Sequence, residues 1–238
     1  MVERSEPRHA ATIGILMLDT AFERFVGDIG NPRTWPFPVR YHIVRGASPD
    51  RVTRPDGPDM LDAFKVAADE LIAHGVAGIV TSCGFLALYQ AELSAHCSVP
   101  VATSALLQVP MAARILPRGK RPAILTFSAE GLTRLHLESV GVDPATPVAG
   151  MPASSDFQRS IRTGDRSVSS ATLEGEVLAA AAQMVRGDPS IGALVLECTN
   201  MTPYSHRISR ALGVPVFDMV TLVHWLHRSV SPQSFSQE

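Results

Sequence analysis

Two of the three cysteines in this sequence hold the same place in two similar segments. Cys83 ends a segment that opens with the apolar run 78–80, and Cys198 follows the apolar run 193–196. Short apolar runs are typical of buried strands, and both are followed by residues at helical spacing. A thiolate is a base and a thiol is an acid, so two cysteines facing one ligand can exchange protons with it. Cys97 lies near a predicted helix end, and we interpret it as a small buried hydrophobe.

The two cysteine segments belong to an internal repeat. Their offset is 115 residues (198 minus 83), and without a gap it gives eight identities over the 28 positions from 80 to 107. The identities include the tripeptide Val-Pro-Val at 99–101 and at 214–216. A repeat near half the chain length predicts two similar α/β halves, each with one cysteine at an equivalent corner. We therefore expect one thiol on either side of a small ligand.

Each cysteine is expected where a strand meets a helix, at the carboxyl edge of a sheet, where open α/β proteins bind ligands. Thr202 predicts an N-cap and Pro203 a first helical residue, so a helix should begin four or five residues after Cys198. A helix N-terminus stabilises a thiolate, and we expect it to lower a thiol pKa from ~8.5 toward neutrality. The backbone amides after each cysteine would also bind a carboxylate.

The composition excludes several classes of function. A net charge of −2 and a pI near 6.4 give no electrostatic basis for binding nucleic acid or an anionic membrane. No apolar run approaches the ~20 residues of a membrane span. The sequence start shows no signal peptide, and an odd number of cysteines is typical of reduced thiols, so we expect a cytoplasmic protein. A homo-oligomer is left open.

The sequence offers little to a metal or a pyridoxal cofactor. The spacings between the cysteines match no zinc-binding pattern, and no histidine pair flanks them. Lys65 and Lys120 are the only lysines; the first lies on a predicted helix and the second between the two halves. Neither is placed for a Schiff base. We therefore expect no cofactor and no metal, with a small carboxylate as the partner.

The remaining pattern predicts an α/β fold of two pseudosymmetric, doubly wound parallel-sheet halves, with the active site in the cleft between them. Further strands are expected at 13–18, 39–44, 99–103 and 122–128, and helices at 58–74, 105–116, 129–138, 173–185 and 219–227. The first half would span 1–117 and the second 118–228, with the last helix packing back on the first half and a frayed tail at 229–238. Two long irregular segments, 27–38 and 151–168, are either lids or packed surface loops.

This arrangement of two cysteines resembles the aspartate/glutamate/hydantoin racemase superfamily, over residues 13–226. The motif at 198–200, Cys-Thr-Asn, is similar to the Cys-Thr-His and Cys-Thr-Glu of glutamate and aspartate racemases. Asp-Thr at 19–20 sits where glutamate racemases carry Asp-Ser after their first strand. Ser-Cys-Gly-Phe at 82–85 departs from their usual Cys-Asn-Thr, so side-chain donors for an α-amino acid are missing on one side.

The resemblance implies a cofactor-independent racemase or epimerase of a small carboxylate, such as an Asp- or Glu-like amino acid or a hydantoin. Cys83 and Cys198 would be catalytic, one removing the Cα proton and the other returning a proton to the opposite face. Backbone amides and nearby side chains would stabilise the enolate-like intermediate. The predicted substrate-binding residues are Asp19, Thr20, Ser82, Gly84, Phe85, Thr126, Ser128, Thr199 and Asn200.

Other hypotheses use the same scaffold. One is maleate cis–trans isomerisation, in which one cysteine adds to the alkene. Another is decarboxylation of a substituted malonate; the malonate decarboxylases of this superfamily keep only the second cysteine, so Cys83 counts against it. A third is a non-catalytic carboxylate binder, against which the presence of both thiols argues.

Overall fold

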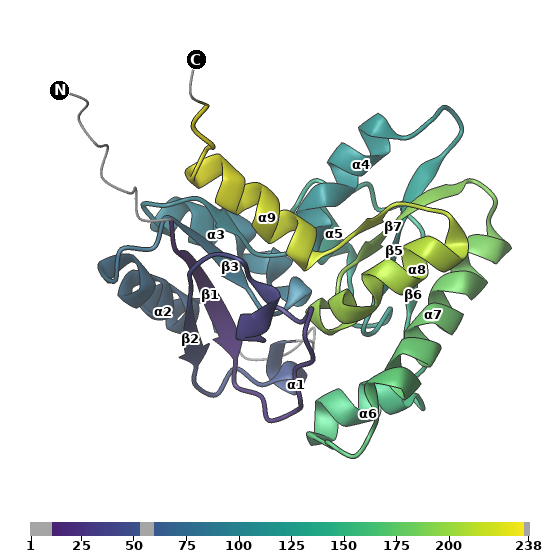
Figure 1. Ribbon diagram of the computed structural model, residues 1–238, viewed down its shortest axis with the longest axis horizontal. Helices are drawn as coiled ribbons and strands as arrows, with labels where there is room; N and C mark the ends of the chain where they lie inside the picture. Colours follow the sequence, from purple (N-terminus) through teal and green to yellow (C-terminus); the bar gives the residue numbers. More distant parts are fainter. Residues whose placement is uncertain (1–10, 53–59, 236–238) are drawn as a thin grey trace.

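The computed structural model describes residues 11–52 and 60–235. As predicted, the fold is α/β, with two four-stranded sheets in which all strand pairs are parallel (Figure 1). The strand orders are β2-β1-β3-β4 and β6-β5-β7-β8. The strands are β1 (Ile13–Leu18), β2 (Val39–Val44), β3 (Gly78–Thr81), β4 (Val101–Ala102), β5 (Arg121–Thr126), β6 (Val148–Gly150), β7 (Ile191–Leu196) and β8 (Val216–Phe217). Every residue of β1 is buried, as a continuous apolar run in a covered parallel sheet should be.

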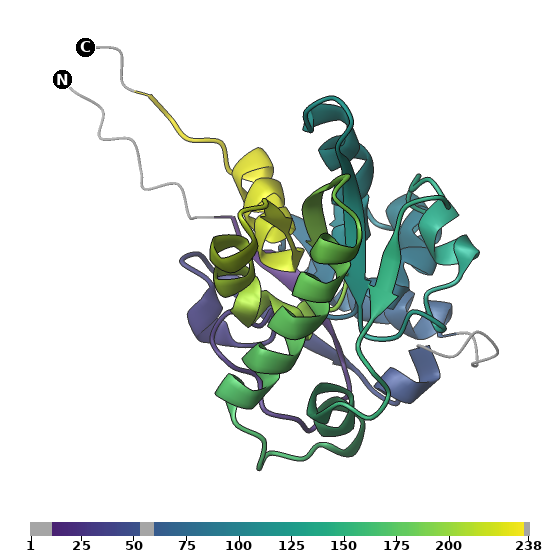
Figure 2. The ribbon, with the colours of Figure 1, turned by 90° about the vertical axis from the view of Figure 1, so that its right-hand side faces the viewer.

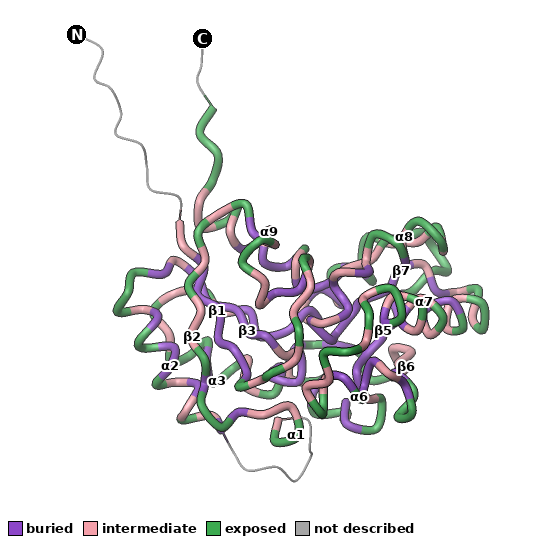
Figure 3. Tube along the Cα trace, turned by 60° about the horizontal axis from the view of Figure 1, so that its bottom comes forward, coloured by how far each residue is buried: buried purple, intermediate pink, exposed green. Residues whose placement is uncertain are grey.

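Helices cover both sheets, so burial is concentrated in the strands (Figure 3). The α-helices are α1 (Pro49–Val52), α2 (Leu61–Ala73), α3 (Gln90–His96), α4 (Val109–Ile115), α5 (Arg134–Glu138), α6 (Asp156–Thr163), α7 (Ser170–Gly187), α8 (Ser205–Leu212) and α9 (Met219–Val230). The 3₁₀ helices are η1 (Pro32–Thr34), η2 (Gly84–Tyr89), η3 (Ala105–Gln108) and η4 (Thr199–Tyr204). The long α7 packs beside the second sheet and buries Leu173, Val177 and Ala181 (Figure 2). Among the described residues, no helix combines the length and apolarity needed to cross a membrane.

The internal repeat is visible in the pairing of the strands. Ile79 pairs with Val101 in the first sheet, and Leu194 pairs with Val216 in the second. Both residues of the second pair lie 115 positions after those of the first (194 minus 79; 216 minus 101). η2 and η4 begin and end at the same offset. The two cysteines, which immediately precede these helices, therefore occupy structurally equivalent positions.

Contacts from one half of the sequence to the other hold the two sheets together. Leu226 of α9 lies so close to β3 that a Cβ at Gly78 would be 3.2 Å from its Cδ2. The ring of Phe37 stacks on His227, with centroids 3.8 Å apart. Gln108 donates a hydrogen bond of 2.8 Å to the carbonyl oxygen of Asp218. All three contacts are made by α9 or by its N-cap residue, Asp218, so this helix joins the two halves.

Several sequence-based expectations about secondary structure were wrong, two of them between residues 129 and 168. The segment 151–168 contains a helix, α6, capped by the Ser155 side chain and anchored by buried Phe157. Its apolar residues are too few for a visible helical period, which is why the segment looked irregular. The helix expected at 129–138 is confined to 134–138, because residues 129–133 form turns. The N-terminal part of the helix expected at 58–74 begins outside the described residues, and its observed part starts at Leu61.

Candidate active site

Cys83 and Cys198 lie at the carboxyl ends of β3 and β7. Each is the N-cap residue of the 3₁₀ helix that begins with the next residue. Backbone N–H groups of Phe85 and Leu86 face the Cys83 sulfur, and the N–H of Asn200 faces the Cys198 sulfur. The sequence therefore placed both thiols correctly at strand–helix corners.

The helix after Cys198 does not begin at Thr202, contrary to expectation. Thr202 and Pro203 lie inside η4, which starts at Thr199. The Thr202 hydroxyl donates to the carbonyl oxygens of Thr199 and Gly27 instead of capping a helix. It thereby ties the cysteine corner to the 27–38 segment.

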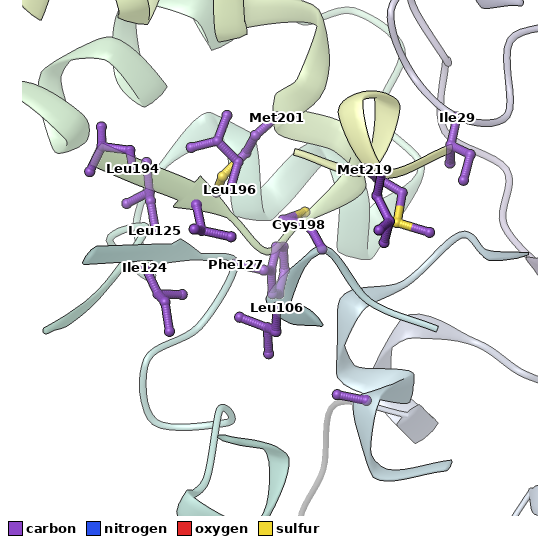
Figure 4. Packing of buried hydrophobic residues seen from close by; sticks show 14 of the residues in the cluster. Ile29, Leu106, Ile124, Leu125, Phe127, Leu194, Leu196, Cys198, Met201 and Met219 are labelled. Carbon is purple, nitrogen blue, oxygen red and sulfur yellow. The ribbon is translucent and has the colours of Figure 1, made fainter. Parts of the chain in front are cut away.

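Both thiols line one cleft where the ends of the two sheets meet. The residues that line this cleft are Leu18, Thr20, Phe22, Arg24, Pro49, Ser82, Cys83, Gly84, Phe85, Phe127, Ile161, Glu197, Cys198, Thr199 and Asn200. Cys198 is 8% exposed and lies beside Phe127 at the edge of the apolar core (Figure 4). The cleft is mainly apolar, with polar groups concentrated around the two corners.

The pKa values of both thiols are raised, so the expected lowering was wrong. Burial raises the pKa of Cys83 to about 12, and the neighbouring Glu197 carboxyl adds to the effect. Burial and then Glu197 raise the pKa of Cys198 well above its ordinary value. The backbone N–H groups at each corner act in the predicted direction, as does Arg24 on Cys83, but desolvation outweighs them.

Glu197, which the sequence analysis did not single out, is the one acidic side chain lining the cleft among the described residues. It is fully buried, and its Oε2 accepts a hydrogen bond of 2.6 Å from the Thr126 hydroxyl. Burial raises the pKa of this carboxyl to about 7. A signal for it was present: a carboxylate at the end of an otherwise apolar strand, directly before a cysteine, is rarely left buried without a role.

A chain of polar contacts links the 27–38 segment to Cys198. Arg24 pairs with Asp28 at 2.8 Å, and Asp28 accepts a hydrogen bond of 2.6 Å from the Asn200 side-chain amide. The Cys198 thiol in turn donates to Asn200 Oδ1 at 3.6 Å. Ile29 and Trp35 are buried, so this segment is packed against the protein rather than lying over it as a loose lid. Arg24 and Asp28 lie in an aperiodic stretch that gave no sequence signal.

Most of the predicted substrate-binding residues gather at the cleft, but three do not line it. Thr20, Ser82, Gly84, Phe85, Thr199 and Asn200 do so. Asp19 is exposed and accepts a hydrogen bond from the Gly46 N–H, because the chain turns away after β1. Thr126 is buried beneath Glu197, and the Ser128 hydroxyl accepts from the Gly131 N–H in a turn. Ile161 reaches the cleft from α6, the segment expected to be a loop.

Metal ligation has little support in this geometry. No group of three or more His, Cys, Asp or Glu side chains within 11–52 and 60–235 is arranged to hold a metal ion. The groups around the thiols are suited to proton transfer and to binding a small charged molecule through amides and Arg24.

Comparison with known proteins agrees with this architecture. The family model described as Asp/Glu/Hydantoin racemase matches residues 67–226, more than half of the chain. The chain belongs to this family. Its curated relatives include a dimethylsulfoniopropionate lyase of Durusdinium sp. clade D, 26% identical over 88% of this chain and 72% of that protein. Dimethylsulfoniopropionate lyase 6 of Emiliania huxleyi (strain CCMP1516) is 29% identical over 88% of this chain and 57% of its own length.

Several solved structures share the fold at low sequence identity. The sulfate-associated Gly74Cys mutant of arylmalonate decarboxylase has a TM-score of 0.64 and 19% identity, covering 95% of this chain and 96% of that one. Other neighbours in the family fold include an aspartate racemase, an allantoin racemase and a maleate cis–trans isomerase. Proteins named as racemases, an isomerase and a decarboxylase thus share this fold.

Proposed function

We propose that this chain removes a proton from the carbon next to a carboxylate, and that it catalyses β-elimination of a small β-sulfonio carboxylate such as dimethylsulfoniopropionate. The observation that carries the proposal is that two thiols, one from each half, line a single apolar cleft. The two curated relatives described above are named as lyases of that compound and align with 88% of this chain. The chain spans only 57% of the Emiliania relative, so the substrate is part of the proposal.

The lining of the cleft favours a substrate whose positive group has no N–H donors. A sulfonium needs no hydrogen-bond acceptors and is attracted to aromatic rings, three of which line the cleft: Phe22, Phe85 and Phe127. Among the described lining residues Arg24 is the one lysine or arginine, and it is paired with Asp28. A positive charge near the thiols would offset the desolvation that raises their pKa values.

In the proposed reaction a cysteine thiolate takes a proton from Cα of dimethylsulfoniopropionate. The electron pair of the broken C–H bond forms the carbon–carbon double bond, and the Cβ–S bond breaks with its pair on sulfur. The products are acrylate, neutral dimethyl sulfide and the protonated thiol, so charge is conserved. The thiol then returns its proton to solvent. Proton transfer of this kind by a positioned side chain contributes about 10²–10⁴-fold to the rate.

We assign the base to Cys83, because the two corners treat their thiols differently. Two backbone N–H groups and Arg24 favour the Cys83 thiolate. Cys198 donates its S–H to Asn200 Oδ1, a contact that only the protonated thiol makes. The elimination needs one base, so the two cysteines should not be equally important.

The test is release of dimethyl sulfide, measured by gas chromatography, from the wild-type protein and three single variants. Cys83→Ser should lower the rate about 10³-fold or more, since a hydroxyl is a far weaker acid than a thiol. Cys198→Ser should lower it about tenfold, and Cys97→Ser, outside the cleft, should match the wild type. No dimethyl sulfide from the wild-type protein would rule out the elimination.

Racemisation of a small carboxylate is the second candidate, and the equivalence of the two corners favours it. A two-base racemase needs one thiol on each face of Cα, which one cysteine from each half could supply. Single enantiomers of Asp, Glu or hydantoins in D₂O, followed by NMR, would test it. Racemisation requires both cysteines, and each Cys→Ser variant would then exchange the Cα hydrogen of only one enantiomer.

A further inference from the structure

The Glu197 carboxyl is a functional group of the cleft that the proposed elimination leaves unused. It lines the cleft, immediately before Cys198 in the chain, and it packs against Gly84, the residue after Cys83. Oε2 accepts a hydrogen bond from the Thr126 hydroxyl, whereas Oε1 is buried with no hydrogen-bond partner among the described residues. Buried polar atoms are almost always partnered, so an unpartnered one at a cleft indicates a group meant for a ligand.

Gly84 leaves space beside the Glu197 carboxyl. A Cβ at position 84 would lie 2.3 Å from Oε1 and 2.5 Å from the backbone oxygen of Glu197. Because position 84 has no side chain, the carboxyl can lie between the two cysteine corners and turn toward the cleft without meeting a Cβ. The same glycine replaces the polar residue that would otherwise bind substrate at the first corner.

The surroundings of Glu197 favour its neutral form once a carboxylate is bound. Burial raises its pKa to about 7, while Thr126 and the Phe127 N–H act in the opposite direction. A substrate carboxylate nearby would raise this pKa further through charge repulsion. Since Thr126 donates to Oε2, the proton belongs on Oε1, the oxygen that faces no donor.

We propose that Glu197 is a catalytic residue, a neutral carboxylic acid whose Oε1–H donates a hydrogen bond to the substrate carboxylate. The inference rests on the proposed function. When the thiolate removes the Cα proton, negative charge moves onto the carboxylate oxygens as an enolate, and this hydrogen bond strengthens. No bond to Glu197 forms or breaks. Loss of one such donor typically lowers the rate about 10²–10³-fold.

Other titratable groups around this carboxyl must be considered in any pH profile. The thiols of Cys83 and Cys198 face it from the two corners, and Glu197 raises the pKa of each. Arg24, which lines the cleft, forms an ion pair with Asp28 on the segment after β1. From α5, the buried His136 packs edge-on against Phe85.

The kinetic test compares Glu197→Gln with Glu197→Met. In the wild type kcat/KM, which reports the unliganded protein, should rise with pH to about 7 as thiolate accumulates, then level off because unliganded Glu197 loses its proton. Glu197→Gln keeps an N–H donor that cannot ionise, so its rate should be about tenfold lower at pH 6 and continue to rise above pH 7. Glu197→Met should be about 10²–10³-fold slower throughout. A glutamine variant as slow as the methionine variant, or one with the wild-type pH profile, would overturn the inference.

Propionate, which lacks a leaving group, tests the same donor without turnover. Calorimetric titration at pH 8 in two buffers of different ionisation enthalpy measures the protons taken up on binding. The wild type should take up close to one proton per propionate, and Glu197→Gln none. If the wild type takes up this proton but produces no dimethyl sulfide, the proposed carboxylate-binding site is supported and the proposed elimination is ruled out. Propionate binding without proton uptake, or no binding by the wild type, would overturn the inference.

Discussion

Two buried titratable side chains lie at the cleft: the carboxyl of Glu197, which lines it, and the imidazole of His136, which packs against Phe85. Burial raises the pKa of Glu197 from 4.5 to about 7 and lowers the pKa of His136 from 6.5 to about 4. Between pH 4.5 and 7 the unfolded chain releases the Glu197 proton before the folded one does, so stability falls as pH rises. Between pH 4 and 6.5 the unfolded chain binds the His136 proton more readily, so stability rises with pH. The two effects oppose each other over most of this range.

In Glu197→Gln the effect of His136 on the pH dependence of stability should therefore appear alone. Without the glutamate, the free energy of unfolding should rise steadily from pH 4.5 to 6.5, and the gain over wild type should reach a few kcal/mol above pH 7. Urea unfolding followed by circular dichroism at several pH values measures this difference. Glu92→Gln, which alters an exposed glutamate of α3 outside the cleft, serves as a comparison for general charge effects. A stability difference independent of pH would contradict the burial argument.

At the scale of single residues, the sequence identified the two cysteines but not the direction in which their thiol pKa values shift. The apolar runs before Cys83 and Cys198 located both corners, because strand ends are encoded locally. The thiol pKa values depend on how completely the second half covers the first, a long-range property that local sequence does not contain. Arg24 and Asp28 were missed for the same reason, since only the fold brings Asp28 to Asn200.

At the scale of elements, the turn from β3 into η2 depends on Gly84. In Gly84→Ala the new Cβ would clash with the side chain and the backbone oxygen of Glu197 and push both away from position 84. We expect this to lower the free energy of unfolding by about 1–3 kcal/mol and the activity at least tenfold. Gly175→Ala is the matched control, because a Cβ there meets nothing within 4 Å and the residue lies inside α7. That change should stabilise the protein by about 0.5–1 kcal/mol. Thermal unfolding and activity measurements on both variants distinguish a local clash from a general effect of alanine.

The segment that follows β1 acts on the site through Asp28. Asp28→Asn removes the charge that pairs with Arg24 and weakens the hold on Asn200, so kcat/KM should fall about 10–100-fold. Asp19→Asn makes the same chemical change at an exposed position off the cleft and should alter kcat/KM less than twofold. Steady-state kinetics measures kcat/KM for both variants and for the wild type. Equal effects would show that Asp28 has no special role.

The elements themselves were predictable where hydrophobic runs are long or regular. β1 and β2 have the predicted bounds, and Gly75, with a φ of +77°, ends α2 as expected. α6 escaped prediction because its few apolar residues show no helical period, although Ser155 and Gly164 do cap it at its two ends. The 3₁₀ geometry of η2 and η4 was missed because the spacing of apolar residues does not distinguish it from an α-helix over one or two turns.

At the scale of the whole molecule, Gln108 is a buried tie between the two halves. Its amide donates to the carbonyl of Asp218 and accepts from the hydroxyl of Thr221 at the start of α9. Gln108→Leu should lower the free energy of unfolding by about 1–2 kcal/mol, because it removes both hydrogen bonds, while the Asp218 carbonyl and the Thr221 hydroxyl still pair with each other. Gln183→Leu on the exposed face of α7 should change it by less than ~0.5 kcal/mol. Denaturant unfolding followed by fluorescence and circular dichroism would show a smaller effect if the tie were dispensable.

The two-half organisation was predictable from the repeat, because a constant offset appears in the sequence itself. The bounds of the halves, 1–117 and 118–228, stay a prediction, and so does assembly into an oligomer. The packing of the last helix on the first half was expected from the sequence, but the stacking of Phe37 on its His227 was not, because the two residues lie far apart in the chain.

The strand register that repeats in the two sheets indicates how the gene for this protein arose. β3 with β4 and β7 with β8 align without an inserted or deleted residue, and the 3₁₀ helices after them have equal length. Such agreement is the expected trace of a duplicated gene whose copies became fused. The ancestral product would have needed to pair with itself to bring two thiols to one cleft. Fusion would let each copy diverge alone, and the residues after the two cysteines, Gly84-Phe85 and Thr199-Asn200, are equivalent positions at which the halves now differ.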